Sequence, residues 1–172
     1  DVTVERERLE GLETHNAALT AELSHRANVE RERDRELDLA MRAGGLGAWS
    51  MDLKTRFIVA SDAYKAILGW PLGSPLGYED RVKSIHPDDR ETVLRSIADC
   101  IARQADYHVE HRIITPAGET RWVSSRGITV LGVDDEPVRI AGVTTDITAR
   151  VRADRMRAAT MELSDVLGDL ND

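Results

Sequence analysis

The sequence predicts an α+β fold in which an antiparallel sheet and its helices form a central domain between two long helices. The first 43 residues contain no proline and a single glycine, which is typical of one long helix. The middle of the chain alternates between helical periodicity and short strand-like runs separated by tight turns. After Thr148, apolar residues return at spacings of three and four, which again predicts a helix.

Residues 1–43 are expected to form an N-terminal coiled-coil helix. Its seam, at the two core positions of a seven-residue repeat, is formed by Leu9, Leu12, Asn16, Leu19 and Leu23. A single asparagine at such a position lowers stability but favours a parallel dimer in register, because its amide pairs with its twin. From Arg26 to Arg35 the seam fills with charge, and a lone solvated helix is the alternative. We favour a parallel homodimer, because a helix with so narrow an apolar stripe gains little by packing alone.

A compact domain is expected from residue 44 to residue 148. Gly44, Gly45 and Gly47 end the first helix, since glycine readily leaves helical dihedral angles. A hairpin and two helices follow, with an irregular loop rich in Gly and Pro between the helices. The expected ranges are 48–53 and 56–60 for the hairpin, 62–68 and 87–103 for the helices, and 71–79 for the loop.

Three strand-like runs complete this domain, at residues 107–115, 120–133 and 138–147. The first two are separated by Pro116, Ala117 and Gly118, and the last two by a pair of aspartates. Because connections this short favour antiparallel neighbours, we expect a three-stranded meander whose sheet is completed by the earlier hairpin.

The last part, residues 149–172, is expected to be a second helix that begins a coiled coil. Thr148 stands where an N-cap residue would, so its side chain is expected to accept from a free amide of the first turn. The apolar residues of the second seam are Met156, Ala159, Leu163, Val166 and Leu170.

Composition limits the classes of partner. The chain has 23 Lys and Arg against 31 Asp and Glu, a net charge of −8, which argues against nucleic acid. No apolar run approaches the ~20 residues of a membrane span. The single cysteine, Cys100, excludes an internal disulfide framework and a multi-cysteine metal site. The chain begins with Asp, and its helical pattern continues to the last residue, so we expect a piece of a longer protein.

Signatures of catalysis are missing from the sequence. It has no phosphate-binding glycine loop, no zinc-ligand spacing and no nucleophile elbow, so we expect neither a catalytic nor a metal site. The run from His86 to Arg90 is interpreted as the start of a helix rather than as a metal cluster. Glu110 and Arg112 share one face of a strand and are expected to form an ion pair. His25 lies in a context faintly like the phosphoacceptor box of histidine kinases, although we favour a place on the flank of the coiled coil.

Six motifs, in order, give the domain a resemblance to a known family. They are GLGAW at 45–49, YKAILGW at 64–70, IHPDDR at 85–90, EHRI at 110–113, GETRWV at 118–123 and GVTTDIT at 142–148. The domain resembles a PAS domain of the subtype common in bacterial sensor kinases and diguanylate cyclases. The resemblance implies a five-stranded antiparallel sheet with helices on one face, an internal cavity, and flanking helices that carry signals. It also implies that Asp146 and Thr148, between the last strand and the exit helix, take part in signal relay.

The cofactor is left open by the sequence. A photoactive cysteinyl-flavin domain of this superfamily would need its cysteine near the middle helices, whereas Cys100 lies late in the long helix. Haem-binding relatives resemble one another in an early histidine of that helix, where this chain has Glu91 to Leu94. Both groups are therefore disfavoured. A non-covalent flavin lined by tryptophan, a small metabolite and an empty pocket all stay open, with Trp122 and Ile140 expected in the core or against a flanking helix.

Four polar or aromatic side chains on the strands are candidate ligand-binding residues, provided that their faces point inward: His111, Ser124, Arg126 and Trp122.

Taken together, these features predict a non-catalytic sensory and dimerisation module of a bacterial signal-transduction protein. It would relay a signal through its flanking helices to an effector domain outside this chain, in a parent that is a histidine kinase or a diguanylate cyclase. The alternatives are a ligand-free scaffold that binds protein partners, and a kinase fragment that includes the start of the dimerisation helix. We expect a cytoplasmic location.

Overall fold

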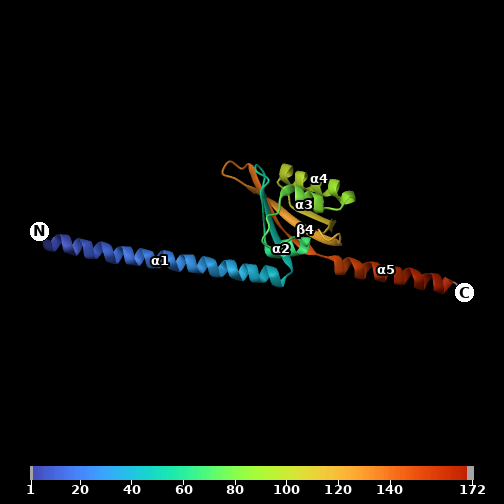
Figure 1. The fold of residues 1–172 in the computed structure, drawn as a ribbon, viewed down its shortest axis with the longest axis horizontal. Coiled ribbons are helices and arrows are strands. Elements are labelled where there is room, and N and C mark those ends of the chain that lie inside the picture. The colour runs from blue at the N-terminus through green and yellow to red at the C-terminus, as the bar shows by residue number, and fades with distance from the viewer. Residues whose placement is uncertain (1, 170–172) are drawn as a thin grey trace. The chain divides into compact units, whose positions relative to one another are not determined.

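The computed structural model describes residues 2–169, with side chains described for residues 4–162. The elements are α1 (Val2–Ala43), β1 (Leu46–Asp52), β2 (Ile58–Ala60), α2 (Asp62–Leu68), α3 (Tyr78–Ser84), α4 (Pro87–Arg103), β3 (Tyr107–Ile114), β4 (Thr120–Leu131), β5 (Pro137–Asp146) and α5 (Thr148–Asp169) (Figure 1). The chain forms two units, one made by α1 and the other by everything from Gly44 onward.

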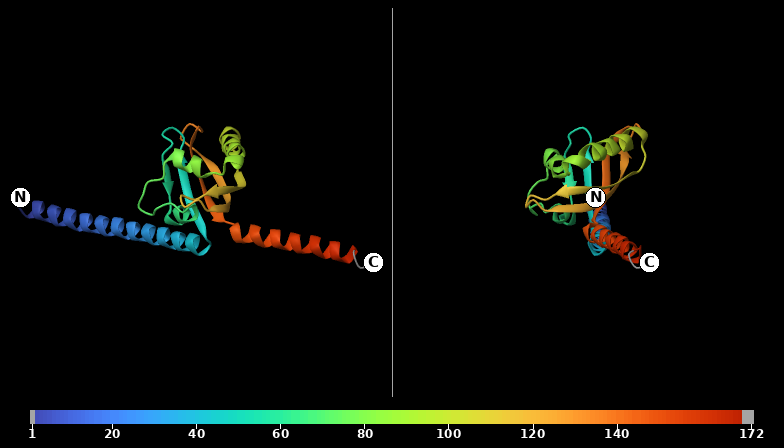
Figure 2. Two further views of the ribbon diagram at one scale, coloured as in Figure 1. Left: turned by 45° about the vertical axis from the view of Figure 1, so that its right-hand side comes forward. Right: turned by 90° about the vertical axis from the view of Figure 1, so that its right-hand side faces the viewer.

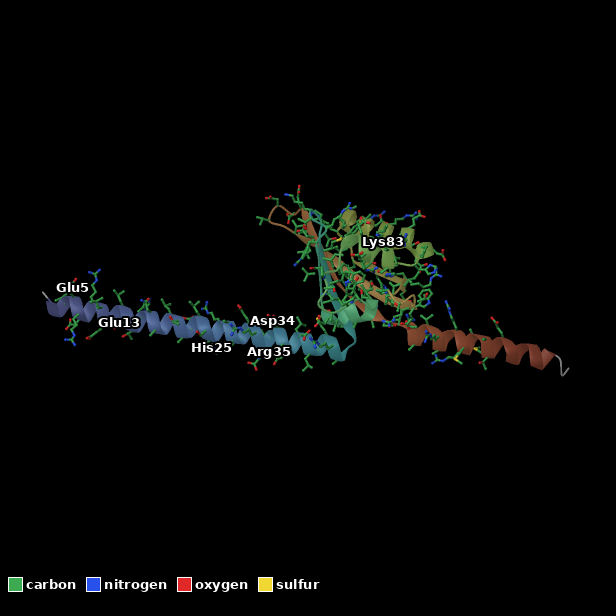
Figure 3. The ribbon with its side chains drawn as sticks, in the orientation of Figure 1. Glu5, Glu13, His25, Asp34, Arg35 and Lys83 are labelled. Carbon is green, nitrogen blue, oxygen red and sulfur yellow. The ribbon has the colours of Figure 1, made fainter. Side chains whose placement is uncertain are left out.

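Helix α1 has solvent-exposed side chains along almost its whole described length. The leucines of the predicted seam are no exception, since each is 44–66% exposed in the single chain. Exposed ion pairs one turn apart, such as Arg6 with Glu10 and Arg26 with Glu22, support the helix. Figure 3 labels five polar or charged side chains on this helix, namely Glu5, Glu13, His25, Asp34 and Arg35.

The second unit is built on a five-stranded sheet with the order β2-β1-β5-β4-β3. Every neighbouring pair is antiparallel, so the predicted meander and the closing hairpin are confirmed. The first strand lies beside the last, with Leu46 opposite Thr145 at one end and Asp52 opposite Arg139 at the other. Strand β4 ends two residues earlier than expected because Gly132 already donates to Glu136 across the turn.

The helices α2, α3 and α4 lie on one face of the sheet (Figure 2). Under α2, Tyr64 and Leu68 pack against Ile113 and Val123 of the sheet, and all four are buried. A second cluster joins Cys100 of α4 to two buried sheet residues, Tyr107 and Ile140. Helix α2 can lie this close to β1 because residue 47 is a glycine. A Cβ at Gly47 would lie 2.5 Å from the Cα atom of Tyr64. A cavity beside these clusters, lined by residues of the sheet and its helices, forms the candidate site.

Helix α3 differs from the prediction, which gave a loop up to residue 79. The helix is seven residues long, follows Gly77 and has no buried residue, so it shows no apolar periodicity in the sequence. None of the described helices has the length and apolar character needed to cross a membrane.

Candidate sensory site and its connection to the exit helix

A cavity lies between the sheet and the helices α3 and α4. Its walls are mainly aromatic and aliphatic, and include Trp49, Tyr64, Val93, Tyr107 and Ile140. The Trp49 and Tyr107 rings meet edge to face, with their centroids 6.3 Å apart. The cavity has a volume of about 50 Å³, enough for a few water molecules. In this conformation the site therefore accepts only a small molecule.

Arg81 is the one charged residue among those that line the cavity. The half-buried side chain comes from α3, and its guanidinium donates to three neutral groups. Nε donates to the Tyr64 hydroxyl at 2.6 Å, Nη1 donates to the Ser84 hydroxyl at 3.2 Å, and Nη2 lies 3.2 Å from Nε2 of His111. Sequence reasoning missed this residue because α3 was not predicted, and no motif contains Arg81.

His111 is the predicted candidate that does reach the interior. It is 1% exposed, and burial together with the nearby Arg81 charge lowers its pKa to about 3. The ring is therefore neutral at pH 7. Because Nε2 faces a guanidinium, it acts as the acceptor, and the proton is assigned to Nδ1. Nδ1 is buried without a hydrogen-bond partner among the described residues.

A chain of hydroxyl groups lies at the other end of the cavity wall. The Trp49 indole N–H donates to the Thr144 hydroxyl at 3.0 Å, and that hydroxyl lies 2.8 Å from the Ser125 hydroxyl. Ser125 lines the cavity, whereas sequence analysis had chosen its neighbour Ser124. Alternation along β4 turns residues 123 and 125 inward and residues 124 and 126 outward.

The predicted candidate set is therefore divided between the two faces of the sheet. The Ser124 hydroxyl lies 3.3 Å from Nε2 of the exposed His108, and Arg126 is exposed in a shallow outer groove beside Gly127 and Gly142. Neither side chain contributes to the interior cavity, because the shared face on which they were predicted is the solvent face. The candidate binding site is therefore formed around Arg81 and Ser125, which line the cavity, with the buried His111 in contact with Arg81.

Trp122 lies between two guanidinium groups on the outer side of β4. The Arg112 guanidinium carbon is 5.8 Å from the centre of the indole, and that of Arg155 is 5.5 Å from it. Arg112 belongs to β3, while Arg155 belongs to α5. The indole therefore connects the sheet to the second turn of the exit helix.

Arg112 is held in place by Asp89, in the first turn of α4. Asp89 accepts three hydrogen bonds from Arg112, which hold the pKa of its carboxyl at about 2, well below the ordinary value. The predicted pair between Glu110 and Arg112 does not form, and Arg112 pairs with Asp89 instead. Glu110 instead pairs with Arg150 of α5, at 2.7 Å.

The junction between β5 and α5 assigns the predicted roles differently. The Thr148 hydroxyl does not cap its own helix, but accepts from the backbone N–H of Trp122 at 3.0 Å. The carboxylate of Asp146 satisfies an amide at the start of α5 instead, by accepting from the N–H of Thr148 at 2.8 Å. Thr148 therefore fixes the start of α5 to β4. Of the second seam, Met156 and Ala159 are exposed, the side chains of Leu163 and Val166 are outside those described, and Leu170 lies outside the described residues.

Comparison with known proteins identifies the family. A family model described as the PAS fold matches residues 57–144, half of the chain. The chain belongs to the PAS family. The predicted PAS fold is thereby confirmed, as is the assignment to a sensory module at the level of the family.

Relatives of this PAS chain include sensor kinases. A blue-light-activated histidine kinase from Brucella anthropi is 28% identical over 166 residues, which cover 95% of this chain and 32% of the kinase. A crystal structure of a sensory box histidine kinase/response regulator from Burkholderia thailandensis is 32% identical, with a TM-score of 0.64, over 75% of this chain and 98% of that one. A domain of a putative light and redox sensing histidine kinase from Haloarcula marismortui is 28% identical, with a TM-score of 0.54. The match covers 68% of this chain and 99% of that domain. The chain spans about a third of the length of the curated relatives it matches.

The residues of this PAS domain do not fit a cysteinyl flavin. The Cys100 thiol donates to the Ala105 carbonyl at 2.9 Å, near Thr129, and does not line the cavity. The cavity itself is smaller than the three-ring system of a flavin. Among the residues whose side chains are described, no group of three or more potential metal ligands comes together.

Proposed function

We propose that this chain is the sensory and dimerisation module of a longer signalling protein, in which the PAS cavity is the sensing site. Residues 1–43 form a coiled coil with a second copy, residues 44–148 sense, and residues 149–172 carry the signal onward. The module itself performs no catalysis. The effector is a histidine kinase domain outside this chain, a proposal supported by the kinase relatives.

The observation that carries the proposal is the attachment of α5 to the sheet at three points. Thr148 binds the backbone of β4, Arg150 pairs with Glu110 of β3, and Arg155 lies over Trp122. Trp122 also lies under the guanidinium of Arg112. Arg112 in turn pairs with Asp89 of α4, the helix that covers the cavity. A shift of α4 against the sheet therefore changes the contacts that set the direction and phase of α5.

Dimerisation through α1 is the second part of the proposal. A helix of 42 residues whose leucines stay exposed has no packing partner in a single described chain. The seam with Asn16 suits a second copy in parallel register, since the two amides can then pair. Two parallel chains would bring two α5 helices to one effector dimer.

The test changes the length of α5 beyond its contacts with the sheet. Residues inserted between the exposed Thr160 and Met161 leave Thr148, Arg150 and Arg155 in place. One inserted residue rotates the following helix by ~100°, and seven nearly restore its phase. We expect autophosphorylation of the full-length parent with ATP to change with one inserted residue and to return with seven. Thr160→Ala, which keeps the length, is the matched control.

Output that ignores the inserted length would contradict the relay and favour the scaffold, in which the PAS core recruits a partner. Production of a cyclic dinucleotide from GTP, without autophosphorylation, would replace the kinase effector by a diguanylate cyclase and keep the relay.

A further inference from the structure

We propose that the interior cavity binds a small organic acid, whose carboxylate pairs with the guanidinium of Arg81. This inference rests on the proposed function, because it takes the cavity as the sensing site. It names the chemical class of ligand that Arg81 and Tyr64 of the cavity wall recognise, with Ser84 and His111 holding the Arg81 guanidinium in place.

The charge of Arg81 has no opposite partner among the side chains that the structure describes. No carboxylate of the described side chains lies within 4.0 Å of its nitrogens, whereas Arg112, Arg121 and Arg150 each have one. The acceptors that Arg81 uses are two hydroxyls and a neutral imidazole. A half-buried cation among neutral groups is stabilised by an anion, and a carboxylate matches the planar fork of a guanidinium.

The cluster also has more donors than acceptors. Arg81 uses three of its five N–H groups, and the Tyr64 hydroxyl accepts from Arg81 while its own proton has no acceptor among the described side chains. A carboxylate brings two oxygens that only accept when ionised, which is the kind of group the cluster lacks. An amine or a second cation would add donors and charge of the wrong sign.

The rest of the cavity suits an apolar body. Trp49, Tyr107 and Ile140 line it, and no acidic side chain does. The available space holds only a few atoms, so a short-chain acid fits it as it stands, and a single ring enters only when a wall moves outward. The wall formed by α3 is the one that can yield, because that helix has no buried residue. At its start the Tyr78 ring lines the cavity and lies 4.9 Å from the guanidinium carbon of Arg56, a second positive charge near the site.

The decisive comparison uses two probes that differ in charge but hardly in shape, phenylacetate and phenylacetamide. Thermal unfolding of the full chain is followed in each, together with titration calorimetry. We expect phenylacetate to raise the unfolding temperature in proportion to its occupancy, and the amide to have no effect. Arg81→Gln should weaken phenylacetate binding about tenfold or more, as expected for the loss of a charged hydrogen-bonding partner.

Matched variants separate recognition from stability. Lys83→Gln removes one positive charge from an exposed position of the same helix (Figure 3) and should leave phenylacetate binding unchanged. If Arg81→Gln does not fold, Tyr64→Phe removes a single hydroxyl beside the guanidinium and should still weaken the acid selectively. Equal binding of acid and amide, or undiminished binding of the acid by Arg81→Gln or Tyr64→Phe, overturns the proposal.

Two further outcomes also overturn it. The first is the absence of any stabilisation by phenylacetate or by straight-chain acids from acetate to octanoate. The second is a flavin released from the purified chain on denaturation. Neither outcome contradicts the proposed signal relay, because the insertion series in α5 measures output without added ligand.

Discussion

Asp89 and Arg112 are joined by three hydrogen bonds, which fix the first turn of α4 to the centre of β3. One Asp89 oxygen accepts from the Arg112 backbone N–H at 2.8 Å and from its Nε at 2.9 Å, and the other accepts from Nη2 at 2.6 Å. The same guanidinium lies over Trp122, which Arg155 of α5 covers as well. One carboxylate therefore orients a guanidinium that lies over the same indole as Arg155 of the exit helix.

Replacing this carboxylate should make the domain less stable in a way that depends on pH. Because the pKa of Asp89 falls from 3.8 to about 2 on folding, its stabilising effect is present above pH 3.8 and is lost as the pH falls through about 2. We expect Asp89→Asn to lower the free energy of unfolding by about 1 kcal/mol at pH 7, after allowance for solvent screening. Urea denaturation at pH 7 and pH 3 measures the difference.

Asp88 offers the control, since its carboxylate is 70% exposed and reaches Arg112 only at 3.3 Å. A loss of stability from Asp88→Asn as large as that from Asp89→Asn would show that charge alone, and not the bidentate geometry, stabilises Arg112.

The contact between Arg155 and Trp122 should hold the beginning of α5 against the sheet. Arg155→Gln removes the cation, and we expect faster hydrogen exchange of the first turns of α5 with little change in global stability. A double-mutant cycle with Trp122→Leu should give a coupling energy of about 0.5–1 kcal/mol. Arg157→Gln, on an exposed side chain two residues away, is the control. If the effects of Arg155→Gln and Trp122→Leu on stability are additive, the two side chains are not coupled and Trp122 takes no part in the relay.

His111 should make the domain weaker in mild acid. Its pKa falls from 6.5 to about 3 on folding, so the unfolded chain binds a proton that the folded chain refuses. Stability from this group is intact above pH 6.5 and decreases as the pH falls towards 3, by up to about 1.4 kcal/mol per pH unit. His111→Gln keeps an acceptor for Arg81 and should flatten this slope between pH 7 and pH 5, as measured by urea denaturation. His108→Gln, on the exposed side of β3, should retain it.

The α1 seam should form a parallel homodimer whose register depends on Asn16. Asn16→Leu is expected to raise the melting temperature and to allow other oligomers, because a buried amide pair is replaced by apolar packing. Sedimentation and thermal unfolding of the full chain measure both effects. Asn28→Leu lies off the seam and should change neither. A wild-type chain that sediments as a monomer at tens of micromolar would contradict the coiled coil.

The sequence was sufficient to predict those helices and strands that have a periodic pattern of apolar residues. Two-residue alternation, short turns and the apolar spacing of the helix from Pro87 to Arg103 predicted the strands, their pairing and α4. The helix α3 was missed because seven residues that bury nothing leave no periodic pattern.

The site was harder to predict because it depends on which face of each strand points inward. Alternation places Trp122, Ser124 and Arg126 on one side of β4, but only the packed structure shows that this side faces outward. Arg81 meets His111 across 30 positions of sequence, and no local signal encodes such a contact. Thr148 was correctly placed at a helix start, yet its hydroxyl binds a neighbouring strand, which a capping rule cannot anticipate.

The register between the first and last strands has a consequence for the evolution of such proteins. Leu46, where the sheet begins, lies directly opposite Thr145, where it ends. The domain thus receives the chain and returns it at adjacent points on neighbouring strands. A fold closed in this manner can be duplicated, inserted or removed as a unit, because the chain enters and leaves the sheet at adjacent positions.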